Sequence, residues 1–401
     1  MAGVLGGVFV FGFFYLGALN VMPDLEIPRP EMPSPNAYDT MIEAVAAIPD
    51  SDKLRKVSRE EVLDPAAVRS VLEDNEDALR IVRAGLRQQY RCPPARSFSA
   101  PHHHFAIRSL VSLLLLESKA KVHDGDMGGA MDAYLDAIHV AFDSQRGGLL
   151  FDQLYGDFLQ RIAHNAVWDT IRDLDAETAR QAAVRLEGLM EGRVPFHELV
   201  QEEKWATLAS YLDLFEDPDW HDFVIQDVAS VKGLESVRLK ARLILMSKRK
   251  ALRDCAEFFD EWLEAAKQPY TSRTNPPEPP TDALNELVLE FVRIEARSFS
   301  FTHSEVQNGL LLTTLALRAF RMDNGSYPDS LYDLVPRYLT KLPADSFGIS
   351  GPLRYKLNGE EYVLYSVGPD GVDDGGRPTG RLGRMVVVEG ETGDIVAGIH
   401  K

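Results

Sequence analysis

The chain contains little cysteine and no excess of positive charge. Only Cys92 and Cys255 occur among its 401 residues. Two cysteines so far apart in the sequence say nothing about their distance in space. Two separate buried thiols are expected, with a disulfide in an oxidising compartment as the alternative. Lysine and arginine number 43 against 61 aspartate and glutamate residues, which gives a net charge of −18. This balance argues against nucleic acid or an anionic lipid surface as the principal partner, because both need a basic face.

Several familiar catalytic signatures are also missing. The sequence has no phosphate-binding glycine loop with its lysine, no Gly-x-Ser-x-Gly nucleophile elbow and no dinucleotide-binding fingerprint. Enzymes exist without these motifs, but their joint absence favours a non-enzymatic protein. With 45% hydrophobic residues, the chain has the composition of an ordinary globular protein, and its length suggests two or three domains.

One long apolar run stands at the start of the sequence. From Ala2 to Leu19 there are eighteen residues without a charged side chain. As a helix they would span about 27 Å, close to the thickness of the hydrocarbon core of a bilayer. We therefore predict an N-terminal transmembrane helix, an uncleaved membrane anchor over residues 1–22. A cleaved signal peptide and a buried core helix are the alternatives, but the run lacks the basic segment and the cleavage site typical of a signal peptide.

The residues after this run bear on the side of the membrane that holds the protein. They carry acids and one basic residue, Arg29. Because positive residues next to a membrane segment hold that flank in the cytoplasm, this flank has little to keep it there. We expect a bacterial membrane-anchored protein whose bulk is extracytoplasmic.

Proline divides the rest of the chain. Five prolines fall in residues 23–36 and five in residues 269–281. Proline at this density does not continue a helix. We predict Pro-rich linkers over these two segments, a helical domain over 37–268 and a C-terminal unit over 282–401.

Capping residues and apolar periodicity predict that the block between the linkers is helical. Ser58 followed by Glu61 has the pattern of a capping box, and Asp64 places a capping acid before the first-turn residue Pro65. Strand-like alternation is almost absent before residue 350. The expected architecture is a set of antiparallel hairpins with helices over 104–122, 125–142, 147–173, 175–191, 197–215 and 235–267.

One hairpin resembles a known repeat. The spacing of Gly125, Ala130, Tyr134 and Ala137 resembles that of the second helix of a tetratricopeptide (TPR) repeat. There the small residues let two helices approach while the tyrosine fills the groove. No second copy follows at the repeat period. A divergent repeat array that binds a peptide and a generic helical hairpin both remain open.

Histidines and basic residues of the helical block are weaker candidates for chemistry. A hydrolase would need His102 to His104, His164, His197 and nearby carboxylates to meet in one concave pocket. No His-x-x-x-His pair completes a zinc site among them. The basic cluster from Arg238 to Arg253 is expected to be a solvated face, with contact to an anionic membrane or a partner as the alternative.

The sequence changes character in its last part. Asp282 is expected to cap a helix that runs to about Ser298, and an apolar helical segment from Glu305 to Met322 continues or restarts it. Asn324-Gly325 should end this helix in a left-handed conformation. Alternating segments then predict a small antiparallel sheet of two hairpins, 353–357 with 362–366 and 384–388 with 395–399.

Three motifs follow one another in this unit. They are Tyr327-Pro328, the run Leu342-Pro343-Ala344-Asp345-Ser346-Phe347-Gly348 and the run Ser366-Val367-Gly368-Pro369-Asp370-Gly371. In this order, over residues 305–376, they resemble the C-terminal domain of type II secretion pseudopilins. The resemblance implies an acidic loop that binds calcium, with Asp370 and Asp373 or Asp374 as candidate metal ligands. Calcium takes roughly six to eight oxygens, which a glycine-rich acidic turn can present together. A surface turn without metal is the alternative.

One departure from the pseudopilin plan limits its meaning. In pseudopilins the helix before the sheet is the membrane-inserting N-terminus, whereas here it lies about three hundred residues into the chain. We therefore expect a pseudopilin-like module fused behind a helical domain, and no assembly into a fibre through that helix.

These observations together predict a mainly α fold. It consists of an N-terminal transmembrane helix, an α-helical hairpin domain and a C-terminal α+β module with a small antiparallel sheet. The predicted function is that of a membrane-anchored envelope protein, non-enzymatic, which binds a protein partner or takes part in assembly. The alternative is a hydrolase that acts on envelope polymers, with its site in the helical domain.

Overall fold

The computed structural model describes residues 25–60, 64–98, 104–273, 276–379 and 387–399. Helices make up most of these residues, and a three-stranded antiparallel sheet lies near the C-terminus. The prediction of a mainly α fold with a small antiparallel sheet is thus confirmed. The predicted transmembrane helix over residues 1–22 lies outside the described residues. Within the described ranges, no helix combines the length and the apolar character that crossing a bilayer requires.

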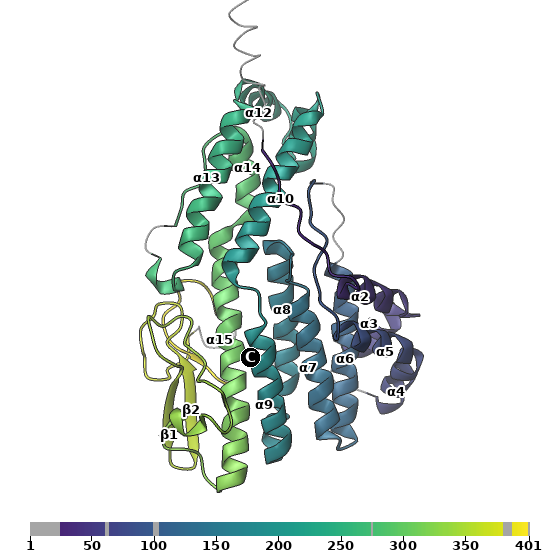
Figure 1. Cartoon of the computed structure of the whole chain (residues 1–401), viewed down its shortest axis with the longest axis vertical. Coiled ribbons are helices and arrows are strands. Elements are labelled where there is room, and N and C mark those ends of the chain that lie inside the picture. The colour runs from purple at the N-terminus through teal and green to yellow at the C-terminus, as the bar shows by residue number, and fades with distance from the viewer. Residues whose placement is uncertain (1–24, 61–63, 99–103, 274–275, 380–386, 400–401) are drawn as a thin grey trace, which may run out of the picture.

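Four short helices form one side of the body (Figure 1). They are α2 Ala37–Ala46, α3 Ser51–Ser58, α4 Pro65–Asp74 and α5 Glu76–Gly85. The predicted start of α4 is confirmed, because the side chain of Asp64 accepts a hydrogen bond from the Ala66 amide at 3.1 Å. The predicted capping box at Ser58 is wrong. Ser58 is the last residue of α3, and its hydroxyl donates to the Leu54 carbonyl of the same helix at 2.8 Å.

Five longer helices lie side by side next to this group (Figure 1). They are α6 His104–His123, α7 Met127–Asp143, α8 Leu150–Val167, α9 Ala176–Glu191 and α15 Ile294–Asn324, with the short helix η1 Ile171–Asp173 between α8 and α9. Gly125 turns the chain between α6 and α7 with a φ of 79°, and Ala130, Tyr134 and Ala137 are buried, as the expected hairpin requires. Helix α15 comes late in the sequence but packs on α8 and α9.

The narrow end of the molecule is built from the middle of the chain (Figure 1). Its helices are α10 Phe196–Glu216, α11 Trp220–Phe223, η2 Val224–Val228, α12 Leu234–Leu245, α13 Lys248–Ala266 and α14 Ala283–Val292. The prediction of one helix over 235–267 is wrong. Met246 is extended with a ψ of 152°, and the Ser247 hydroxyl accepts a hydrogen bond from the Lys250 amide at 3.2 Å, which starts α13 as a separate helix.

Two hydrophobic cores result, and α15 takes part in both. The first core joins α2–α9 to the later turns of α15 and to the sheet. The second joins α10–α14 to the first turns of α15 through Ile294 and Phe301. Asp282 caps α14 as predicted, but α14 ends at Val292, before Arg293 with its φ of 46°, and not near Ser298. The C-terminal unit therefore shares its core with the preceding helical block.

A row of buried polar residues fixes α15 against α8. Asn308 of α15 accepts a hydrogen bond from Nε2 of His164 at 3.1 Å and donates to Gln160 at 2.9 Å, and Ser304 donates to the same Gln160 oxygen at 2.9 Å. Burial lowers the pKa of His164 to about 4, so its ring is neutral at physiological pH. A slip of one residue between these helices would leave buried polar atoms without partners, which costs about 1–3 kcal/mol for each.

Both Pro-rich segments pack on the body. Leu25 and Ile27 lie against the second core. In the later segment, η3 Tyr270–Ser272 brings the ring of Tyr270 to 5.3 Å from the ring of Phe347 in an edge-to-face arrangement.

The sheet contains strands β1 Arg354–Asn358, β2 Glu361–Ser366 and β3 Ile395–Val396 in the order β1-β2-β3. The first predicted hairpin is confirmed, with Gly359 at a φ of 63° in its turn. Ile395 and Val396 pair with β2. Of the strand predicted over 384–388, Val387 and Val388 belong to no strand, and the rest lies outside the described residues.

Two of the sequence motifs meet at the carboxylate of Asp345. It is buried and accepts hydrogen bonds from the Ser366 hydroxyl at 2.6 Å, the Val367 amide at 2.9 Å and the Phe347 amide at 3.2 Å. Near the same place α15 comes close to the loop, because a β-carbon on Gly309 would lie 3.2 Å from Cβ of Pro343. The Tyr-Pro motif joins as well, since Tyr355 of β1 donates its hydroxyl hydrogen to the Pro328 carbonyl at 2.8 Å. The short helix η4 Leu331–Leu334 follows this motif.

We predict that Asp345→Asn lowers the free energy of unfolding by about 1–3 kcal/mol, because the amide cannot accept all three hydrogen bonds and turns donor hydrogens toward buried donors. Urea denaturation followed by circular dichroism measures the change. Asp370→Asn, at a loop residue that is not buried, is the matched control; with a chelator present in all samples it should stay within about 0.5 kcal/mol of the wild type. Equal stability of the two variants would show that the Asp345 contacts do not hold the module.

Candidate functional site

The predicted calcium ligands lie together in one acidic turn after β2. Asp370 accepts a hydrogen bond from the Val372 amide at 3.1 Å. Asp373 accepts bonds from the Tyr365 hydroxyl at 3.0 Å and the Gly375 amide at 2.9 Å. Asp374 lies 3.8 Å from Arg377. Each of the three carboxylates thus already has a contact within the module.

A fourth carboxylate, which the sequence did not indicate, anchors this turn from the other side. Asp394 is buried and accepts hydrogen bonds from the amides of Gly376 at 2.6 Å and Asp374 at 3.3 Å. Burial raises the pKa of Asp394, and these two amides counteract the rise. No group of three or more histidine, cysteine, aspartate and glutamate side chains in the described ranges is arranged to hold a metal ion. The calcium site stays a prediction.

Of the histidines required for the hydrolase alternative, the two whose side chains the structure describes, His164 and His197, do not line the same pocket. His197 lines a surface groove, whereas His164 is buried between α8 and α15. His102, His103 and the side chain of His104 lie outside the described residues. Of the histidines that the sequence proposed for one site, only His197 can therefore be placed at the groove.

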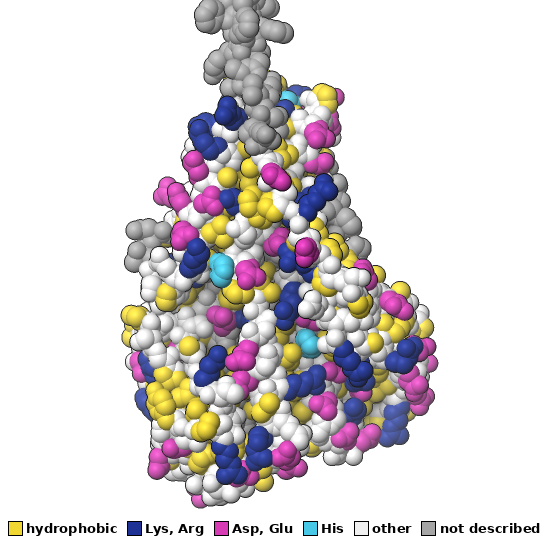
Figure 2. Space-filling model, viewed as in Figure 1, with side chains coloured by type: hydrophobic (Ala, Val, Ile, Leu, Met, Phe, Trp, Pro, Cys, Tyr) yellow, Lys and Arg dark blue, Asp and Glu magenta, His cyan; other side chains and the backbone are white. Residues whose placement is uncertain are grey.

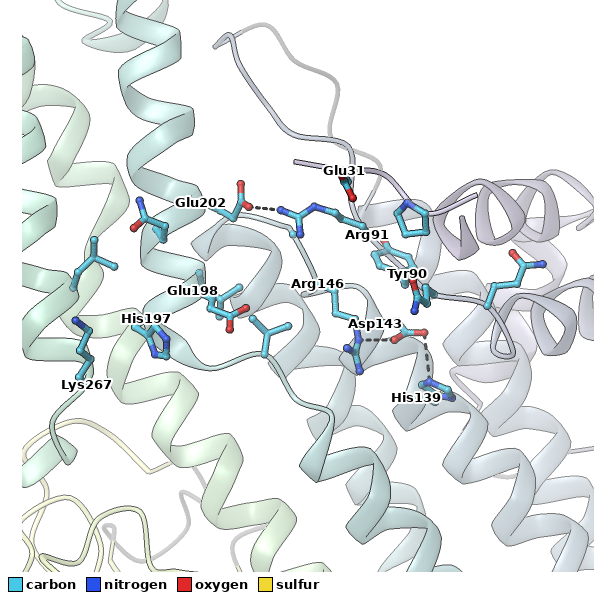
Figure 3. A pocket seen from close by; sticks show the side chains of 18 of the residues that line it. Glu31, Tyr90, Arg91, His139, Asp143, Arg146, His197, Glu198, Glu202 and Lys267 are labelled. Atoms are coloured by element: carbon cyan, nitrogen blue, oxygen red, sulfur yellow. Dashed lines mark hydrogen bonds and ion pairs between the residues drawn. The ribbon is translucent and has the colours of Figure 1, made fainter. Parts of the chain in front are cut away.

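The groove has a volume of about 1010 Å³ and lies where the two cores meet (Figure 3). One wall comes from the end of α7, the following loop and the segment after α5. The other comes from the first turns of α10 and the last turns of α13. Its described lining contains both signs of charge and three glutamines: Glu31, Gln88, Gln89, Arg91, His139, Asp143, Arg146, His197, Glu198, Gln201, Glu202, Asp260, Glu264 and Lys267.

On the α7 wall, a histidine and an arginine share one buried aspartate. Asp143 accepts a hydrogen bond from Nε of Arg146 at 2.9 Å, and Nε2 of His139 lies 3.5 Å from its other oxygen. Burial lowers the pKa of His139 and raises that of Asp143. Figure 3 shows the three side chains together on this wall, across the groove from His197.

Ion pairs tie the other wall to its surroundings. Glu202 of α10 pairs with Arg91 at 2.5 Å and with Arg96 at 3.6 Å, which joins α10 to the segment after α5. Lys204 donates to Asp260 at 2.6 Å and joins α10 to α13. Together these pairs hold the elements that form the groove at fixed positions.

The groove is lined mainly by charged and amide side chains. Among its described lining residues there is no serine, threonine or cysteine, so they offer no hydroxyl or thiol nucleophile of that kind. Its charged and amide groups come from both walls. Such a lining suits an extended ligand with many polar contacts.

Sequence reasoning named His197 but missed Arg91, Asp143 and Arg146. These residues come from separate segments that only tertiary packing brings together. No local pattern in the sequence marks them. Comparisons of this chain with protein-family models, with curated proteins and with solved structures found no match.

Glu203 stands beside the groove and links two helices. Its carboxylate accepts a hydrogen bond from the Leu150 amide at 2.8 Å, at the start of α8. Burial raises the pKa of Glu203 to about 7, and the nearby Asp152 contributes in the same direction. Because the folded-state pKa is raised, this glutamate adds stability below its unfolded-state pKa of about 4.3, and the contribution is lost as the pH rises through 7.

We predict that Glu203→Gln raises the free energy of unfolding by about 1–2 kcal/mol at pH 8 and leaves it nearly unchanged at pH 4, because the amide mimics the protonated acid. Urea denaturation at a series of pH values measures this difference. Glu261→Gln, at an exposed position on α13, is the control and should follow the wild-type pH profile. A Glu203→Gln variant that is less stable than the wild type at pH 8 would contradict the raised pKa.

Proposed function

We propose that this protein is anchored in a bacterial membrane by residues 1–22, has its bulk outside the cytoplasm, and binds a protein partner without catalysing a reaction on it. In this proposal the groove holds an extended segment of the partner. The observation that supports it is the lining of the groove, in which charges of both signs and amides are distributed along two walls. The net charge of −18 argues against nucleic acid as the partner.

The lining also indicates the character of the bound segment. Gln88, Gln89 and Gln201 can each donate and accept hydrogen bonds, which suits the backbone of an extended peptide. Lys267 and Glu198 lie on the same wall with opposite charge (Figure 3). We therefore expect a polar segment that carries charges of both signs. Acidic and basic side chains are also interspersed over this face of the molecule (Figure 2).

We predict that a photoreactive benzoylphenylalanine at position 198 forms a discrete protein adduct in cells, identified by mass spectrometry. The same group at Val184, an exposed position on α9 away from the groove, is the control and should form no such adduct. Lys267→Glu should weaken the adduct by roughly fivefold, because loss of one exposed charge contact costs about 1 kcal/mol. Similar adducts at both positions, or none at 198, would rule out the groove as the partner site.

We further propose that the acidic turn binds calcium through Asp370, Asp373 and Asp374, as the pseudopilin resemblance implies. Calcium at about 100 times its Kd would then stabilise the folded protein by about 2.7 kcal/mol and raise the Tm by a few degrees. Asp373→Ala combined with Asp374→Ala should abolish this calcium-dependent gain. The comparison uses the difference between calcium and chelator within each protein, because Asp373→Ala also removes bonds to Tyr365 and Gly375. No calcium-dependent gain in the wild type ends the proposal.

A further inference from the structure

Helix α12 carries apolar side chains on two opposite faces. Leu239 and Leu243 pack on the second core. The outward-facing set is Leu234, Val237, Ile244 and Leu245, with exposed fractions of 77%, 65%, 44% and 61%. A helix turns by about 100° per residue, so these four side chains fall within an arc of about 100°. Soluble monomers seldom leave such a contiguous apolar face uncovered.

Basic residues border this face in a chain that is otherwise acidic. Between Val231 and Lys250 there are seven lysines and arginines and a single acid, Glu235, although the net charge of the chain is −18. By helix geometry, Arg238 borders the exposed face on one side and Lys240 on the other. Lys240 pairs with Asp222 at 2.6 Å, whereas Arg238 is exposed and forms no ion pair with the described residues.

The position of α12 matches the predicted anchor. The described chain begins at Leu25, and both Leu25 and Ile27 lie against the second core, on which Leu239 of α12 also packs. Figure 1 shows α12 and the start of the described chain at the same narrow end, far from β1 and β2. Figure 2 shows dark blue side chains near this end. An anchor that precedes Leu25 would bring this end to the membrane surface.

We propose that the exposed face of α12 lies on the surface of an anionic membrane. Its four apolar side chains enter the boundary between headgroups and acyl chains, and the bordering arginines and lysines contact the lipid phosphates. The body then stands on the bilayer with the sheet pointing away from it. This inference rests on the proposed attachment to a membrane, but docking by α12 is tested separately from the anchor.

Charge distinguishes a membrane from the other occupants of this face. A second copy of the chain, packed face to face, would bring two basic borders together at a cost in repulsion. The apolar run Ala2–Leu19 has no charge to complement the basic border. An anionic lipid surface matches both the apolar stripe and its basic border.

The test uses the full chain in vesicles and a reporter at one of two matched valines. The side chains of Val237 on α12 and Val184 on α9 are 65% and 60% exposed. Each is replaced by cysteine, Val237→Cys or Val184→Cys, and labelled with a nitrobenzoxadiazole dye. Both native cysteines are kept, because neither reacts readily with the dye: burial raises the pKa of Cys92 to about 12, and Cys255 is buried. Quenching by brominated lipids reports contact with the acyl region.

In vesicles that contain phosphatidylglycerol, we expect quenching and a blue shift at 237 and neither at 184. Lys232→Glu combined with Arg238→Glu should weaken docking on the membrane, as measured by the label at 237, by at least about twentyfold. Each basic residue near an anionic surface strengthens membrane binding about fivefold. Lys56→Glu with Arg59→Glu, exposed basic residues near the end of α3, should leave it unchanged. Pure phosphatidylcholine or high salt should weaken the quenching.

Two results would overturn the inference. One is a label at 237 that remains in water while the chain is in anionic vesicles. The other is a label at 237 that is shielded without any lipid, which would mean that the apolar run or a second copy covers α12.

Alkaline carbonate extraction separates this inference from the proposed anchor. Resistance to carbonate without quenching at 237 would support the anchor and reject docking by α12. Release by carbonate, with charge-dependent quenching at 237 before the extraction, would reject the anchor and support docking.

Discussion

The structure depends on one helix that must fit two cores at once. Helix α15 buries Ile294 and Phe301 in the second core and its later leucines in the first, and the sheet packs on it as well. Apolar contacts alone would tolerate small shifts along the helix. The polar row of Ser304 and Asn308 against Gln160 and His164 does not, because a shift would strand buried donors and acceptors. The register of α15 therefore sets the relation between the two cores and the position of the sheet.

The groove follows from this arrangement, because it lies at the junction of the two cores. The pair of Glu202 with Arg91 joins its two walls, and the pair of Lys204 with Asp260 joins the two helices of one wall, so the groove is present before any partner binds. A preformed groove loses less conformational entropy on binding than a disordered one. In the proposed orientation on the membrane, α12 and the anchor hold the narrow end, and the groove and sheet stand clear of the lipid. In that orientation the basic border of α12 serves docking on the membrane. The acidic character of the rest of the chain serves its solubility.

The sequence predicted much of the local structure and little of the groove. The start of α4 at Asp64 and the hairpin around Gly359 were predicted correctly, because caps and turns depend on a few adjacent residues. Ser58 failed as a cap because the same hydroxyl can serve its own preceding helix, and only packing selects between the two uses. The predicted helix over 235–267 failed because the local cap at Ser247 competes with continuous helical periodicity. Arg91, Asp143 and Arg146 were missed because their meeting depends on how distant segments pack.

By itself the sequence determined the helical class, the helix starts at Asp64 and Asp282, the first hairpin of the sheet and the apolar and basic character of α12. All of these rest on interactions within a few residues, which neighbouring side chains decide. Tertiary structure alone decided that the C-terminal unit shares a core with the helical block and that Asp345 joins two motifs through Ser366 and Val367. It also decided that the described residues leave one apolar face of α12 exposed. These features require chain segments that are far apart in sequence to exclude water together, which no local pattern encodes.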